Sequence, residues 1–186
     1  MPPRIKITKE KIIASAVELV RRCGAEALNA RSVAKEIGSS TQPVFTNFSS
    51  MDDLKSSVIA AAYGIYLGFI EREVESGKYP RYKAFGMAYI RFAREEKELF
   101  RLLFMRDRTG EDLSSSPDFD ASVEMIVAMM GVDTETAKLI HLEMWSAVHG
   151  IATMLATSFL TLDTELISKM ISDVYTGVQK NHTDRG

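Results

Sequence analysis

Few side chains in this 186-residue chain have the types and spacing of a reaction centre. His141 and His149 are eight residues apart, which puts them on roughly one helical face but too far apart to share a metal ion directly. The pair Glu95 and Glu96 is more simply a solvated helix face than an acid/base couple. We find no Cys-His pair, Gly-rich phosphate loop or nucleophile motif. We therefore expect no enzymatic activity, no metal and no cofactor.

The composition is that of a globular protein. Apolar residues make up 46% of the chain, charged residues make up 26%, and the formal net charge is -2. This is enough apolar surface to bury a core, and too little net charge for a disordered chain or a polycation that coats nucleic acid. The length predicts one domain, or a small domain carried on a larger one. Any nucleic-acid site must be local.

Cysteine content and hydropathy indicate a cytoplasmic protein. Cys23 is the single cysteine, so no internal disulfide can form, and no secretory leader opens the chain. The uncharged run 144–162 is nearly long enough for a membrane span, but it contains a histidine and several hydroxyl side chains. We expect this run to be a buried helix at a protein interface, and we expect no membrane partner.

Apolar residues recur with helical spacing throughout, and no alternation of period two is present. The chain is therefore predicted to be all-α, with eight or nine helices. Ser39 or Ser40 is expected to cap a short helix at Pro43, with Val44, Phe45 and Phe48 packed inward. The predicted helical segments are one that ends at Gly24, then 29–37, a short one at Pro43, 50–76, 81–105 with a joint near 95–98, 118–130, 134–159 and 164–180, with a loop at 107–117.

Charge divides the chain into two parts. Residues 1–55 hold nine basic and six acidic residues, a net charge of +3, whereas residues 56–186 hold 14 basic and 19 acidic residues, a net charge of -5. We predict an N-terminal domain at 1–55 and a larger helical domain at 56–186. A basic three-helix unit on an acidic body suggests local DNA binding.

The second and third predicted helices have the spacing of a helix-turn-helix. Small Ala34 lets two helices cross closely, and Gly38 supplies a turn conformation that a residue with a Cβ atom resists. Val33, Ile37 and Val44 are placed to close the wedge between the helices. Many helical hairpins share this pattern, so it favours DNA binding without establishing it.

The stretch 12–54 resembles the DNA-binding domain of tetracycline-repressor (TetR) family transcription regulators. Its amphipathic first helix is followed by the marks of that family, which are Gly24, Leu28-Asn29, Ala34, Gly38, Phe45 to Phe48 and Leu54. The resemblance implies an all-α chain with an N-terminal helix-turn-helix domain, followed by a helical ligand-binding and dimerisation domain.

Carried onto this sequence, the resemblance places Thr41, Gln42, Pro43 and Thr46 on the groove-facing side of the recognition helix. Gln42 is the best base-reading candidate, because a carboxamide can donate and accept together at adenine. Phe45 and Asn47 occupy places where the family often has Tyr and His at the DNA backbone. Phe45 lacks the hydroxyl and can offer packing or methyl contact only, whereas Asn47 can still hydrogen bond a phosphate.

Phosphate contacts are implied at the start of the second helix and in the fourth. Asn29 and Arg31 combine a helix N-terminus with a cation. Met51 stands where the family commonly has a phosphate-binding Lys, and Lys55, one turn later, is the candidate substitute. Arg4 and Lys6 fit either a minor-groove arm or solvated charges on a frayed terminus.

The C-terminal part resembles the family's regulatory domain more weakly. The segment WSAVHG at 145–150 is similar to a subgroup with a Trp-His-Gly signature. In that subgroup the last two helices pair with their copies in a second subunit as a four-helix bundle, which implies a homodimer. The interface residues implied here are Met154, Phe159, Leu166, Met170, Ile171, Val174, Tyr175 and Val178.

Methionine is frequent, with ten residues, and flexible thioethers suit a cavity for apolar ligands of several shapes. Core filling is the alternative for each of them singly. As a set, apolar and aromatic residues with two histidines predict a pocket for a small apolar or aromatic effector. The predicted lining is Phe85, Tyr89, Phe92, Phe104, Met105, Met125, Met129, His141, Met144, Trp145 and His149.

The sequence thus predicts a bacterial, homodimeric repressor that binds a palindromic double-stranded operator and is released by a small-molecule effector. The alternative is a ligand-binding protein of the same fold with weak or lost DNA binding, which Met51 and Phe45 favour. A helical-bundle enzyme is a more distant possibility.

Overall fold

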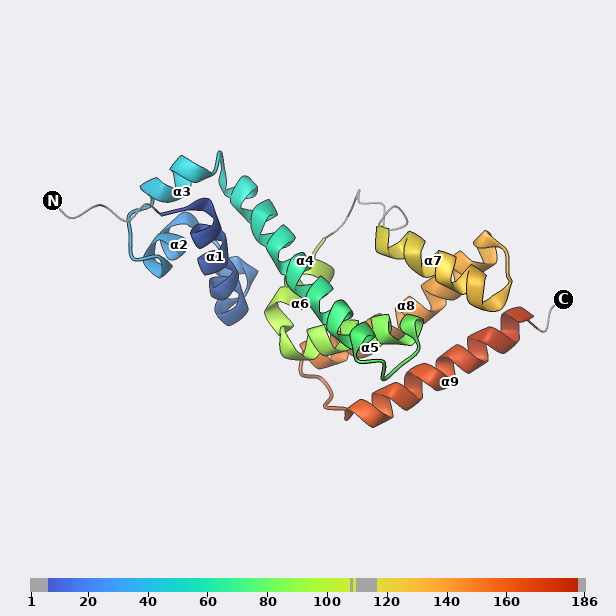
Figure 1. Ribbon diagram of the computed structural model, residues 1–186. Coiled ribbons are helices and arrows are strands. Elements are labelled where there is room, and N and C mark those ends of the chain that lie inside the picture. Colours follow the sequence, from blue (N-terminus) through green and yellow to red (C-terminus); the bar gives the residue numbers. More distant parts are fainter. Residues whose placement is uncertain (1–6, 108, 110–116, 184–186) are drawn as a thin grey trace. The chain divides into compact units, whose positions relative to one another are not determined.

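The computed structural model describes residues 7–107, 109 and 117–183, and in these ranges every regular element is helical (Figure 1). The predicted all-α class is confirmed. Arg4, Lys6 and most of the predicted loop at 107–117 lie outside the described residues. No helix among the described residues is both long and apolar enough to cross a membrane. The helices are α1 (Lys9–Cys23), the 3-10 helix η1 (Ala25–Ala27), α2 (Ala30–Glu36), α3 (Gln42–Asn47), α4 (Met51–Glu75), α5 (Arg81–Glu95), α6 (Lys97–Phe104), α7 (Pro117–Met130), α8 (Thr134–Ala156) and α9 (Thr164–Thr183).

The chain divides into two units that are not continuous in sequence. The first comprises residues 1–68 and 96–106, and the second comprises residues 69–95 and 107–186. Helix α4 runs through the predicted domain boundary at residue 55 and contributes to both units. The division into an N-terminal domain at 1–55 and a larger domain at 56–186 stays a prediction.

The helix-turn-helix is shaped by side-chain caps and by one glycine. Asn29 caps α2, because its Oδ1 accepts from the Ser32 N–H at 3.0 Å. After α2, Gly38 takes a φ of 67°, the Gly38 N–H donates to the Lys35 carbonyl at 3.1 Å, and the Ser39 N–H donates to the Ala34 carbonyl at 2.9 Å. These two bonds form a Schellman motif, which requires a left-handed residue at Gly38.

The start of α3 corrects one sequence expectation. Neither Ser39 nor Ser40 caps the helix; the N-cap position is Thr41, and no side chain caps it. Ser39 Oγ instead donates to the Ser40 carbonyl at 2.8 Å. The Ser39 N–H closes the Schellman motif, and α3 begins three residues later, at Gln42.

Helix ends elsewhere follow the predicted signals closely. Ser50 Oγ accepts from the Asp53 N–H at 3.1 Å, and Asp53 Oδ2 accepts from the Ser49 N–H at 2.9 Å, so two side chains satisfy backbone donors at the start of α4. The joint predicted near 95–98 falls at Glu96, between α5 and α6. Helix α8 ends at Ala156, three residues before the predicted end.

The core of the first unit is apolar and packs α1 against α2 and α6. Ile12, Val33, Val44 and Leu54 are fully buried. Phe45 was expected to pack inward with Val44 and Phe48, but 55% of its surface is exposed. In a helix of six residues only one narrow face can be buried, and Val44 and Phe48, four residues apart, already form it.

The second unit is held by α8, which packs against α5, α7 and α9 (Figure 1). Between α7 and α8, Ile126, Ala137 and Ile140 form a fully buried cluster. Helices α5 and α8 approach closely at Gly86, where a Cβ atom would lie 3.3 Å from a methyl of Val148. Lys83 Nζ joins α5 to α9 by donating to Ser168 Oγ at 2.7 Å and Ser172 Oγ at 2.8 Å.

The core cluster gives a stability prediction. Ile126→Ala should lower the free energy of unfolding by about 2–5 kcal/mol, because it removes buried methyl groups and leaves a cavity. Glu124→Ala, two residues away on an exposed position of α7, should change it by less than about 0.5 kcal/mol. Urea unfolding followed by circular dichroism measures both, and equal effects would contradict the packing described for α7.

Candidate functional site

The exposed face of α3 carries the residues predicted to meet DNA. Gln42, Phe45 and Thr46 are exposed, whereas Thr41, Pro43 and Asn47 are half-buried. The opposite face holds Val44 and Phe48 in the core. The helix therefore presents one polar face that also carries an aromatic ring.

Hydrogen bonds within α3 already engage two of these polar side chains. Thr46 Oγ1 donates to the Gln42 carbonyl at 2.9 Å, and Asn47 Nδ2 donates to the Pro43 carbonyl at 2.8 Å. No hydrogen bond is present from the side chains of Thr41 or Gln42 to any described residue. The Gln42 carboxamide is thus the polar group on this helix with all its donors and acceptors available.

Candidate phosphate contacts differ in their surroundings. Asn29 is engaged twice, since it caps α2 and its Nδ2 donates to the Ala27 carbonyl at 3.2 Å. Arg31 and Lys55 are exposed and form no ion pair with any of the residues described. Met51 is half-buried at the start of α4. Among the predicted phosphate contacts, Arg31 and Lys55 are therefore the available cations.

A contact that the sequence did not predict joins α1 to α6. Arg21 Nε donates to Glu96 Oε2 at 2.7 Å, and the Glu96 side chain is only 16% exposed. Arg21 also pairs with Glu18, and its hydrogen bond to Glu96 raises the pKa of Arg21. At the same place, a Cβ atom on Gly24 would lie 3.1 Å from Glu98. Helix α6, though distant in sequence, belongs to the helix-turn-helix unit.

Cys23, at the C-terminal end of α1, is a free and exposed thiol. It lies next to Gly24, where α1 ends. The recognition helix α3 is a separate element that begins at Gln42.

Two tyrosine–histidine pairs lie within the second unit. The Tyr82 hydroxyl lies 3.0 Å from His141 Nδ1, and the Tyr89 hydroxyl lies 2.8 Å from His149 Nδ1. Burial raises the pKa of Tyr82 and lowers the pKa of both histidines. The lowered pKa of each histidine favours the neutral imidazole, and the tautomer of each ring decides which partner donates. Trp145 stacks on His149, with ring centroids 4.7 Å apart.

The eleven predicted lining residues are divided between the units. Phe104 and Met105 belong to the first, and the other nine belong to the second. Tyr89, Phe92 and Met144 are buried, while Met105 and Met129 are 40% and 49% exposed. Ligand binding by this set stays a prediction.

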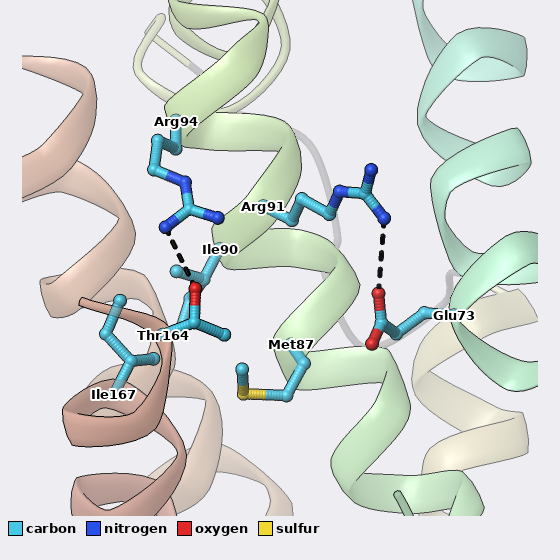
Figure 2. A pocket seen from close by; sticks show the side chains of 7 residues that line it. All are labelled: Glu73, Met87, Ile90, Arg91, Arg94, Thr164 and Ile167. Carbon is cyan, nitrogen blue, oxygen red and sulfur yellow. Dashed lines mark hydrogen bonds and ion pairs between the residues drawn. The ribbon is translucent and has the colours of Figure 1, made fainter. Parts of the chain in front are cut away.

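A small hollow in the second unit is lined by other residues (Figure 2). Its volume of about 30 Å³ suits about two water molecules and not an aromatic effector. In Figure 2, Arg94 points to Thr164, with a hydrogen bond of 3.2 Å, and Arg91 points to Glu73 on the other side. The full lining is Glu73, Met87, Ile90, Arg91, Arg94, Thr164 and Ile167.

The predicted dimer residues are exposed to different degrees. Phe159, Leu166 and Val174 are 75%, 43% and 37% exposed. Met154, Met170, Tyr175 and Val178 are half-buried, and Ile171 is buried within the unit. Three further leucines were not among the predicted interface residues. Leu139 and Leu142 on α8 and Leu160 after it are 48%, 51% and 42% exposed. The spacing of the two α8 leucines, three residues apart, was the signal for a second apolar stripe.

The buried histidines predict a pH dependence of stability. The unfolded chain takes up protons as the pH falls through the ordinary histidine value of 6.5, whereas the folded unit resists protonation. Stability should therefore fall as the pH is lowered from about 8 to about 5.5.

His141→Gln should flatten this dependence, and the part due to His149, whose pKa is also lowered by burial, should remain. Urea unfolding at a series of pH values measures the slope. An unchanged slope in the His141 variant would show that His141 is not the group responsible.

Residues 82–174, half of the chain, match the family model described as "Tetracyclin repressor-like, C-terminal domain". An uncharacterized HTH-type transcriptional regulator from Mycobacterium tuberculosis is 22% identical, with 97% of this chain and 86% of that protein covered.

Two solved structures share the fold. A protein of unknown function from Rhodococcus sp. RHA1 has a TM-score of 0.69 and 20% identity, with 91% of this chain and 92% of that chain covered. A TetR family protein from Vibrio parahaemolyticus, described as a transcriptional regulator, has a TM-score of 0.62 and 17% identity, with 90% and 96% covered. With half of its length matching the family model, the chain belongs to the tetracycline-repressor-like family.

Proposed function

We propose that this protein is a DNA-binding transcription regulator, and specifically a homodimeric bacterial repressor that acts in the cytoplasm. The observation that carries the proposal is the exposed face of α3, with the free Gln42 carboxamide, in the same unit as the unpaired cations Arg31 and Lys55. A helix-turn-helix of this form lies in the major groove through its second helix, and nearby cations contact phosphates. The names of the M. tuberculosis and V. parahaemolyticus relatives support the same function.

Dimerisation is proposed through α8 and α9. Leu139 and Leu142 on α8 and Leu166 and Val174 on α9 are exposed apolar residues of one unit. Pairing these faces with a second copy would remove them from water in a four-helix bundle. Two recognition helices would then read half-sites about 34 to 36 Å apart, or a multiple of that spacing, in a palindromic operator.

Release by a small apolar or aromatic effector is proposed to act through α4 and α6. Helix α5 belongs to the second unit, and α6, which follows directly at Glu96, belongs to the first. A ligand that shifts α5 would therefore pull on α6 and on the α1 residues that it contacts. A differential affinity for the two conformations worth about 1 to 3 kcal/mol is typical of such coupling.

DNA binding is tested by selection of sites from a randomised double-stranded pool at near-physiological salt. We expect enrichment of an inverted repeat. Gln42→Ala should lose about 1–3 kcal/mol of binding free energy at one base pair of each half-site. The preference for one base at that position should weaken accordingly. Arg31→Ala should weaken binding to all DNA sequences alike. It should also make the slope of log affinity against log salt concentration less steep by about one per subunit. If both variants bind as the parent protein does, the proposed groove face is wrong.

The dimer proposal predicts that Leu142→Glu yields a monomer, because the interface would have to bury an unpaired carboxylate. Leu67→Glu is the matched control, since Leu67 is 41% exposed on α4 in the first unit. It should leave the dimer intact. Sedimentation velocity measures the mass of both variants, and a dimeric Leu142→Glu variant would refute this interface.

A second candidate is a ligand-binding protein of this fold with weak or lost DNA binding. It is favoured by half-buried Met51 and by Phe45, which cannot donate to a phosphate. A regulator with several phosphate contacts should show a steep decrease of DNA affinity with salt. A slope near zero would support the second candidate.

A further inference from the structure

We propose that Phe45 reads the 5-methyl group of a thymine, in the same or the neighbouring base pair as an adenine bound by Gln42. The inference rests on the proposed DNA binding and names the base pairs at the centre of that contact. Each half-site would then require A·T pairs at these positions.

The first observation is the exposure of the Phe45 ring. Its neighbours Val44 and Phe48 are 0% and 2% exposed, whereas Phe45 is 55% exposed. The ring packs on no other aromatic ring or cation among the residues described. An aromatic ring that is more than half exposed, without an aromatic or cationic partner among the described residues, is available for an apolar partner outside the chain.

The second observation removes competing base readers from α3. The Thr46 hydroxyl and one Asn47 amide N–H bond to carbonyls of the same helix. Pro43 has no N–H donor. Thr41 is half-buried at the N-cap position of α3. Gln42 and Phe45 are the exposed residues of α3 whose side chains form no hydrogen bond within the described chain.

Helical geometry places these two side chains side by side. Residues three apart on a helix are neighbours on one face, with Cβ atoms about 5–6 Å apart. Consecutive base pairs are about 3.4 Å apart along the duplex, so the two side chains reach the same pair or adjacent pairs. In the major groove, adenine presents N6 and N7 to a carboxamide, and thymine presents its methyl group to an apolar side chain.

Charge favours DNA as the occupant of this face. Arg31 and Lys55 flank α3 in sequence and are exposed without ion pairs among the described residues. Such cations suit a polyanion, and an apolar protein partner would leave them unmatched. The ring therefore meets an apolar group that is displayed within a polyanion, which the thymine methyl provides.

The test begins with the inverted repeat selected from the randomised DNA pool. Each thymine of the consensus is replaced in turn by deoxyuridine, which lacks the methyl group and keeps its base pairing. Each replacement is made singly. For the parent protein, the replacement at one particular thymine of a half-site should weaken binding about fourfold, the size expected for burial of one methyl group. Fluorescence anisotropy with the labelled duplex measures the affinities.

Protein variants identify the side chain that reads the methyl group. In Phe45→Ala the thymine and deoxyuridine duplexes should bind equally. Phe45→Tyr retains the ring and should retain the preference for thymine. Leu67→Ala, which truncates another exposed apolar side chain of the same unit with no assigned DNA contact, is the matched control and should also retain it. Circular dichroism confirms that each variant is folded.

The outcomes separate this inference from the proposed function. If no sequence is enriched, DNA binding itself fails, and the inference fails with it. If an inverted repeat is enriched but no deoxyuridine replacement weakens binding, the protein is a DNA-binding regulator and the inference is wrong. The same holds if the preference for thymine survives in Phe45→Ala.

Discussion

The helix-turn-helix unit depends on a part of the chain that lies far from it in sequence. Arg21 on α1 donates to the largely buried carboxylate of Glu96, which is the residue between α5 and α6. A buried carboxylate requires a partner, so α1 and the start of α6 must stay together. The first unit is consequently completed by residues 96–106, which belong to the region that matches the family's C-terminal domain.

This arrangement makes the joint at Glu96 more than a break in a long helix. Residues 81–95 pack against α8 in the second unit, and residues 97–104 pack against α1 in the first. If α5 and α6 were one continuous helix, a displacement in one unit would be imposed on the other in full. The joint allows α5 and α6 to pack separately, each within its own unit.

Much of the fold follows from local signals in the sequence. The positions of Asn29, Gly38, Ser50 and Glu96 predicted helix ends, because caps and left-handed turns depend on few neighbouring residues. The capping of α3 was mispredicted, since the Schellman turn after α2 takes Ser39 into its own hydrogen bonds. Helical spacing made Phe45 available to pack inward, but it is exposed because a short helix has a narrower buried face than its apolar content suggests.

The candidate sites were less predictable than the fold. The Arg21–Glu96 contact joins residues 75 positions apart, and no local pattern indicates it. The tyrosine partners of His141 and His149 lie on another helix, so the sequence could name the imidazoles but not their hydrogen bonds. The exposure of Leu139 and Leu142 depends on which face of α8 packs against α5, α7 and α9. That face is set by the packing of all four helices and not by the local sequence.

The single thiol of the chain has a practical consequence. Cys23 is exposed at the end of α1, in the unit that contains α3 but not on α3 itself. A maleimide dye or nitroxide attached there would mark one defined point of the helix-turn-helix unit without any change of sequence. In an assembly of two copies, the distance between the two probes would report directly on the separation of the units, in solution and with or without added compounds.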